Sequence, residues 1–173
     1  MPGNHGHAGN DAFMAAVQEA AYPITDDYNA ARREGFGRLQ VTIADGKRMS
    51  AARAYLRPAM RRGNVEVRVN AQATRIVIER DTARAVDYVQ DGNAHRVLAT
   101  REVIVAGGVI NAPQLLMLSG IGDPTQLTQH RIAVKVALPG VGRNLQDHVS
   151  VIVMYKRRER SPFLCNMRAE VIF

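Results

Sequence analysis

Two consecutive glycines, Gly107 and Gly108, lie where an apolar run meets a helix and could form a ligand-binding turn. The run at residues 102–106 is typical of a strand that is buried on both faces of a parallel sheet. Residues 111–113 predict a helix cap followed by proline, with the helix continuing over residues 114–118. Glycine lets another molecule approach the backbone closely, and a helix start offers free N–H groups that suit a phosphate.

The same arrangement has a second explanation, because a glycine pair between strand and helix also allows two backbones to pack closely. Two further glycine pairs, at residues 120–122 and 140–142, follow a helix end and a proline respectively. Neither pair completes G-x-G-x-x-G after a strand, so the chain contains no dinucleotide fingerprint. The residues alone therefore leave a cofactor turn and plain close packing both open.

The remaining residues with reactive side chains give weaker signals. The five histidines have no metal-ligand spacing with acids or cysteine, and we expect no metal site. His148 ends the polar run at residues 144–148, which either lines a pocket or bonds its own backbone. The single cysteine, Cys165, has no visible base beside it. We therefore expect no catalytic residue in this chain.

Helices are predicted in the first third of the chain and after the glycine pair. Asp11 is a candidate cap for a helix to about Ala21, and residues 22–45 are typical of a loop. Ser50 is a candidate cap for a second helix, whose apolar face would use Ala51, Ala54, Tyr55 and Met60 and which Pro58 would end or kink. Later, Ser119 and Gly120 end the helix that follows the glycine pair, and Asp123 starts a short helix to about His130.

Strand patterns fill the middle of the chain. Valines alternate with polar residues at 65–69, and further strands are expected at residues 73–79, 85–89 and 96–99. Turns are expected at residues 80–81 and 91–93, so that these strands form an antiparallel meander with one wet face. One more strand is expected at residues 132–138, ended by Pro139 and Gly140.

Composition places the chain among globular proteins and narrows its partners. Apolar residues make up 46% and charged residues 23% of the 173 residues. The net charge of +7 comes from scattered arginines, and an acid interrupts the densest cluster, residues 156–160, so we expect no nucleic-acid partner. No apolar run has the length of a membrane span, and the first residues lack a secretory pattern. These features predict a cytoplasmic location.

Four segments in the same order resemble the glucose–methanol–choline (GMC) oxidoreductase family. Residues 106–122, AGGVINAPQLLMLSGIG, are similar to the second family signature, and residues 138–148, LPGVGRNLQDH, to the segment that follows it. Residues 27–29 and 46–56 also fit. The similarity extends over nearly the whole chain from Phe13, and the branch it resembles is the choline-dehydrogenase-like alcohol dehydrogenases, with residues 161–163 also in keeping.

The resemblance implies that FAD is the cofactor and that a small alcohol is the substrate. It places Ala73, where valine is usual, against the adenine end of FAD, and brings Ala106, Gly107 and Gly108 close to the cofactor. Ala112 stands where the family has serine, which weakens one capping hydrogen bond without removing the motif. His148 does not correspond to the catalytic histidine of the family.

The resemblance also implies an α/β fold with α+β character. We expect residues 1–149 to be a partial FAD-binding region, a partial parallel sheet with an antiparallel meander, and residues 150–173 to start the substrate-domain sheet. The family's N-terminal dinucleotide-binding unit and its C-terminal catalytic region are expected to be missing. The alternative to an oxidoreductase fragment is a non-catalytic module that pairs with a separate nucleotide-binding chain.

Overall fold

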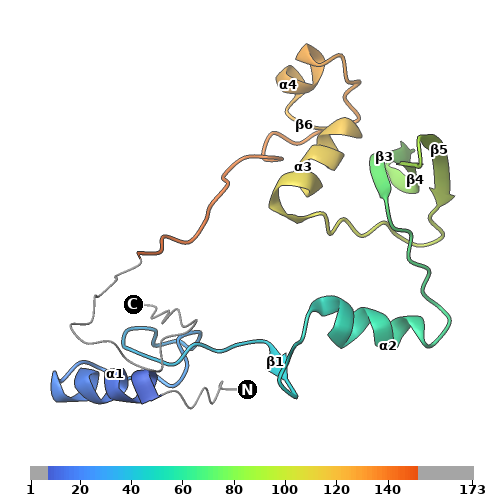
Figure 1. Ribbon diagram of the computed structural model, residues 1–173. Helices are drawn as coiled ribbons and strands as arrows, with labels where there is room; N and C mark the ends of the chain where they lie inside the picture. Colours follow the sequence, from blue (N-terminus) through green and yellow to red (C-terminus); the bar gives the residue numbers. More distant parts are fainter. Residues whose placement is uncertain (1–7, 152–173) are drawn as a thin grey trace. The chain divides into compact units, whose positions relative to one another are not determined.

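The computed structural model describes residues 8–151, which form helices, short strands and three small sheets (Figure 1). They divide into two compact units, of which one is Glu66–His148 and the other holds the remaining described residues. Within this described part, no helix has both the length and the apolar character needed to cross a membrane. The predicted mixture of helices and strands is confirmed.

The first helix, α1, comprises Ala8–Glu19. The predicted helix is therefore present, but it begins before Asp11, so that Asp11 lies in its first turn and is not its cap. The carboxylate of Asp11 accepts a hydrogen bond from Arg38. Acidic groups in a first turn interact favourably with the helix dipole, which explains why the helix tolerates this position for Asp11.

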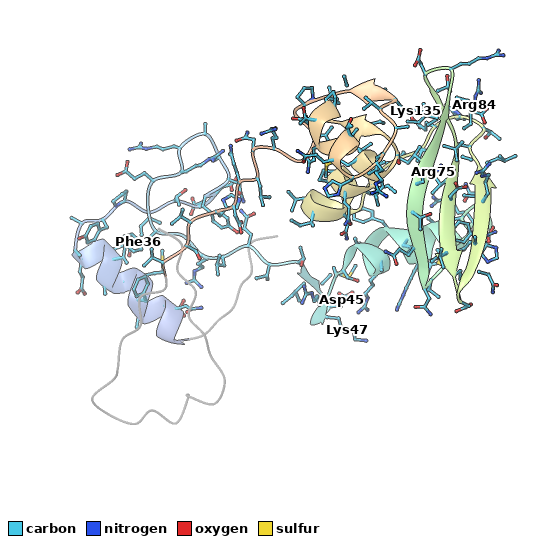
Figure 2. All side chains as sticks on the ribbon, turned by 90° about the horizontal axis from the view of Figure 1, so that it is seen from above. Phe36, Asp45, Lys47, Arg75, Arg84 and Lys135 are labelled. Carbon is cyan, nitrogen blue, oxygen red and sulfur yellow. The ribbon has the colours of Figure 1, made fainter. Side chains whose placement is uncertain are left out.

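An aromatic cluster around Phe36 holds the loop that follows α1. The Phe36 ring centroid lies 6.0 Å from that of Phe13 and 5.5 Å from that of Tyr22 (Figure 2). Phe36 also forms a parallel bridge with Ile24. The predicted loop over residues 22–45 is thus confirmed for most of its length, and it ends in a small hairpin that the sequence analysis did not predict, β1 Ile43–Ala44 and β2 Lys47–Arg48.

The second predicted helix is present as two joined pieces, the π-helix η1 Ala52–Leu56 and α2 Arg57–Met60. The hydroxyl of Ser50 accepts a hydrogen bond from the N–H of Arg53 at 3.3 Å, which confirms Ser50 as a cap. Pro58 does not end this helix, which continues to Met60, and the wider turn of η1 lies directly before Pro58. The predicted apolar face of this helix is not buried as expected, since Tyr55, one of its members, is 76% exposed.

The meander has three antiparallel strands in the order β3-β4-β5: Ala71–Glu79, Thr82–Gln90 and Asn93–Leu98. Asp91 and Gly92 connect β4 to β5 with φ of 51° and 78°, which confirms the predicted tight turn. The predicted strand at residues 65–69 is wrong. Alternating valines suit a strand, but a strand also needs a partner for its backbone groups, and no described strand pairs with these residues.

After the meander come α3 Gly108–Leu118, β6 Ile121–Gly122, α4 Pro124–Gln129 and β7 Val136–Ala137. β6 and β7 pair in parallel. The strand expected at residues 132–138 is therefore reduced to two residues. The side chain of Asp123 accepts hydrogen bonds from the N–H groups of Thr125 and Gln126, which confirms the predicted cap of α4.

The predicted buried strand at residues 102–106 is wrong as an element of this structure. These residues are extended but carry no strand pairing, and Ile104 is 78% exposed. A strand buried on both faces depends on neighbouring strands and covering helices, and the described residues supply none for this segment. Val103 and Val105 are half-buried and face the interior of their unit.

Candidate functional site

The glycine pair lies at the start of α3, with Gly107 as its N-cap and Gly108 as its first residue. The prediction that Asn111 caps this helix is wrong. The helix begins before Asn111, and both Asn111 and Pro113 lie within it. Gly108 has φ of 82°, a backbone conformation that residues other than glycine adopt only at a cost in free energy. This sharp turn lets the helix start directly after the extended segment.

The space around this turn bears on the two explanations of the glycine pair. Ala106, Gly107 and Gly108 are all exposed. A Cβ placed on Gly107 would lie 3.3 Å from the Cβ of Asn111 and 3.4 Å from the N of Ala112, whereas one placed on Gly108 would meet no atom within 4 Å. Close packing of one backbone on another would have filled that space. The structure therefore presents an open backbone turn, as a ligand-binding turn requires.

The N-terminus of α3 is also electrostatically suited to an anion. No side chain caps it, and its first turn contains no acidic residue. The first N–H groups of a helix have no partner within the helix and carry a partial positive charge. This end of α3 could hold a phosphate of a nucleotide cofactor through backbone groups alone.

Ala73 lies on β3, which is an outer strand of the meander. Its own side chain is exposed, and it lies opposite Tyr88 of β4 in the register. The register shifts between Ala73 and Arg75, and the hydroxyl of the intervening Thr74 donates to the carbonyl of Asp87 at 3.1 Å. Such a shift changes the direction of the strand locally and interrupts the regular ladder. Ala73 is thus placed at an accessible, irregular strand edge.

Aromatic and basic side chains support the strand opposite Ala73. The Tyr88 ring stacks on His95 of β5 with centroids 5.1 Å apart, and the guanidinium of Arg68 lies 5.5 Å from the Tyr88 centroid. Arg68 also donates to the Tyr88 hydroxyl and to Glu66. The hydrogen bonds that Arg68 donates, first to the Glu66 carboxylate and second to the Tyr88 hydroxyl, raise the pKa of Arg68 above its usual range. Tyr88 is buried by these contacts, which fix its strand firmly.

The other face of the meander carries an ion-pair ladder across all three strands. Asp87 accepts two hydrogen bonds from Arg96, at 2.6 and 3.1 Å, and one from Arg75 at 3.0 Å. The hydrogen bond from Arg96 is the main reason why the pKa of Asp87 lies below its ordinary value. These groups neutralise one another on an open surface, so we assign them no chemical role.

Ser119 was predicted only as part of a helix end, but the structure gives it a larger part. It is buried, and its hydroxyl accepts a hydrogen bond from the N–H of Ile76 at 2.8 Å while donating to the carbonyl of Leu115 at 2.6 Å. Gly120 follows with φ of 88°, which confirms the predicted helix end. The serine hydroxyl is a frequent helix-end group, so no sequence signal distinguished this contact with a strand from a local one.

The sequence-predicted site residues therefore occupy two places. Ala106, Gly107 and Gly108 form one continuous turn, whereas Ala73 lies on β3. No hydrogen bond of the described residues joins Ala73 directly to the glycine turn. The connection between the two places runs through α3 and the hydrogen bond that the N–H of Ile76 donates to the Ser119 hydroxyl.

A cavity of about 290 Å³ lies in the same unit, between β3, residues 103–105, α3 and the β6–β7 pair. Its lining is almost entirely aliphatic, with Asp81 as the one charged contributor. A substrate site needs a few convergent polar groups to orient the reacting molecule. This cavity lacks them and is not a candidate for the chemistry.

The second explanation of the loop around His148 holds for Asp147, whose carboxylate accepts a hydrogen bond from the N–H of His148. Asn144 accepts instead from the side chain of Gln146, and His148 is exposed. Arg143 joins the start of this loop to Asp123 at 2.9 Å and, together with backbone N–H groups, lowers the pKa of Asp123. Cys165 and residues 156–160 and 161–163 lie outside the described residues. Within those that are described, no group of three or more His, Cys, Asp or Glu could hold a metal.

Comparison with known proteins identifies the family. The family model described as GMC oxidoreductase matches residues 3–150. The chain belongs to the GMC oxidoreductase family. This confirms the resemblance drawn from the glycine turn and the segments around it.

The relatives of this GMC oxidoreductase chain include choline dehydrogenases. Human choline dehydrogenase, mitochondrial, is 47% identical over 151 residues, which are 87% of this chain and 25% of the relative. An oxygen-dependent choline dehydrogenase from Brucella anthropi is 47% identical over 142 residues, covering 82% of this chain and 26% of the relative. The chain thus spans about a quarter of the length of the curated relatives that it matches.

Solved structures of the same kind resemble the chain. Pyridoxine 4-oxidase from Mesorbium loti superposes with a TM-score of 0.70 and 27% identity, covering 80% of this chain and 27% of that one. An FAD-dependent oxidoreductase from Chaetomium thermophilum gives a TM-score of 0.71 with 25% identity, over 78% and 24% of the two chains.

Proposed function

We propose that this chain is part of the FAD-binding region of an oxidoreductase that acts on CH–OH groups. The substrate would be choline or another primary alcohol, oxidised to a carbonyl compound. Membership of the GMC family and the names of the choline dehydrogenase relatives support this proposal. When bound, FAD supplies the hydride acceptor. The observation that carries the proposal is the open, glycine-built turn at the uncapped start of α3.

The residues of the chain fit an FAD nucleotide at two places. The backbone of Ala106, Gly107 and Gly108 would approach the cofactor, and free N–H groups at the start of α3 suit its phosphates. The exposed strand edge at Ala73 would contact the adenine end through the backbone, so that alanine in place of valine leaves the contact possible. The chain's own part is to bind and orient the cofactor, and we propose no catalytic residue in it.

The proposed domain division places residues 1–149 in the FAD-binding region and residues 150–173 at the start of the substrate-domain sheet. The family match, which ends at residue 150, supports it. The cytoplasmic location predicted from the sequence stays a prediction, because the human and mouse choline dehydrogenases are named as mitochondrial, whereas the bacterial relatives are named without a location.

Titration of the ¹⁵N-labelled chain with millimolar FAD, followed by NMR, tests the proposal. We expect weak binding, no alcohol oxidation by the isolated chain, and shifts at the amides of Gly107, Gly108 and Thr74. Gly108→Val should weaken binding about tenfold or more, because a side chain would fill the open face of the turn and strain the backbone. Gly140→Val is the matched control, since a Cβ there also meets nothing within 4 Å.

Two results would contradict this function. Unshifted amides at the glycine turn and at Thr74 would remove the proposed site. Co-purification of the chain with a separate nucleotide-binding polypeptide, without any FAD shifts of its own, would favour the non-catalytic module instead.

A further inference from the structure

We infer that Ser119 is a positioning residue that holds the two proposed FAD-contacting segments, Ala73 and the glycine turn, at a fixed separation. The inference rests on the proposed function, because it concerns how that site is assembled. Ser119 itself is buried and lies at the opposite end of α3 from Gly107 and Gly108, so it acts through the helix and not by touching the cofactor.

The burial of Ser119 makes its two hydrogen bonds specific. It is 6% exposed and is the one buried polar residue of the described chain. Its hydroxyl donates to Leu115 one turn back in α3 and accepts from the N–H of Ile76 in β3. A buried polar group away from water is costly unless it is paired, so both partners are held in place.

The bond to Ile76 places the end of α3 on the outer edge of β3. Ile76 lies three residues beyond Ala73 on the same strand, and its N–H is used by Ser119. Ala73 is exposed on the same strand, so the helix end covers one part of β3 and leaves the proposed adenine contact accessible. The hydrogen bond therefore connects α3 to the strand that carries Ala73.

The helix itself forms the rigid spacer. α3 has 11 residues, which correspond to about 16 Å of α-helix. Gly107 and Gly108 lie at its start and Ser119 at its end, so a shift of Ser119 against β3 would move the glycine turn relative to Ala73. The spacer and its anchor together set the distance that an extended dinucleotide has to bridge.

Gly120 fixes the direction in which the chain leaves this anchor. With φ of 88°, it is buried, and a Cβ there would lie 2.5 Å from the carbonyl oxygen of Ala133. The chain then enters β6 directly, and the N–H of Lys135 donates to the carbonyl of Gly120 at 2.8 Å. The anchor is therefore held on both sides, by β3 and by the segment before β7.

This arrangement predicts different effects on a long and a short ligand. FAD would contact both segments at once, so its affinity depends on their separation. Adenosine, which has no phosphate, would contact only the edge at Ala73 and is indifferent to the position of the glycine turn. Loss of the Ser119 hydroxyl should therefore reduce the affinity for FAD and spare that for adenosine.

The test compares the affinities of FAD and adenosine by NMR titration in Ser119→Ala, Ser119→Thr and the parent chain. We expect Ser119→Ala to weaken FAD binding about fivefold or more and adenosine binding by less than about twofold. Ser119→Thr keeps the hydroxyl and should restore the FAD affinity. Hydrogen exchange at the Ile76 amide should be faster in Ser119→Ala than in the parent chain, and unchanged in Ser119→Thr.

Leu127→Ala is the control for general loss of stability, because Leu127 is fully buried in the same unit. It should leave the ratio of the FAD and adenosine affinities unchanged. The inference would be overturned, and the proposed function left intact, if Ser119→Ala lowered the affinities for both ligands equally or lowered neither. A parent chain that shows no FAD shifts at Gly107, Gly108 and Thr74 would overturn both.

Discussion

The meander β3–β5 and the extended segment at residues 102–106 are both rich in branched apolar residues, yet only the meander forms strands. Each strand of the meander has its partner one tight turn away, so its backbone groups are paired locally. Residues 102–106 have the composition of a strand buried on both faces but no described partner. The comparison shows that a strand pattern becomes a strand only when the chain also brings a second edge to it.

Substitution of matched isoleucines should produce the largest contrast between these two regions. Ile76→Ala should lower the free energy of unfolding by about 3 kcal/mol, because Ile76 of β3 is buried and lines the aliphatic cavity together with Leu116 of α3. Ile104→Ala should cost less than about 0.5 kcal/mol, because that side chain is 78% exposed. Urea unfolding of the chain measures both. An equal loss for Ile104→Ala would show that residues 102–106 are buried in solution, for instance by self-association.

Substitution in the hairpin turn should give an intermediate effect. Gly92→Ala should destabilise the meander by about 1 kcal/mol, because Gly92 has φ of 78° and alanine adopts that conformation at a cost. Gly140→Ala is the control, since it has similar free space and φ outside the left-handed region. Amide exchange should quicken in β4 and β5 and stay as fast as before at residues 103–106. A uniform change over both regions would mean that the meander does not fold as a local unit.

The smallest expected effect is the loss of folding stability at acid pH, and it should also be confined to the meander. The pKa of Asp87 is lowered by Arg96 first and then by Arg75, so the folded chain binds this proton less tightly than the unfolded chain. The stabilisation is present above the ordinary pKa of an aspartate and is lost as the pH falls through the lowered value. Between neutral and acid pH, the free energy of unfolding should depend less on pH in Arg96→Gln than in the parent chain.

Arg101→Gln serves as the control for the acid response, because Arg101 is exposed and forms no ion pair with any described residue. It should leave the acid dependence as in the parent chain. The same dependence in Arg96→Gln and the parent chain would show that the ladder on Asp87 is not the source of the response.

Local features of the fold could be predicted from the sequence because their partners are close in the chain. The turn at Asp91 and Gly92, the caps Ser50 and Asp123, and the helix end at Gly120 are all confirmed. Each depends on backbone groups within a few residues, which local residue types determine.

Features that depend on distant partners could not be predicted in the same way. The alternating valines at 65–69 and the run at 102–106 predicted strands, but periodicity does not say whether a partner strand is present. The start of α3 was placed too late because Asn111 and Pro113 resemble a helix start, whereas the freedom of Gly108 allowed the helix to begin earlier. The bond from Ser119 to Ile76 joins residues 43 positions apart, and no local pattern indicates it.

The wide turn in η1 has a consequence for comparing this chain with its relatives. The N–H of Arg57 bonds the carbonyl of Ala52 five residues earlier, so one extra residue is held in that turn. Each residue of an α-helix advances by about 100° around the axis, and a relative with one residue fewer here would present α2 rotated by that angle. Single-residue gaps in alignments across positions 52–57 would then record a change in which side chains face outward, with the helix itself preserved.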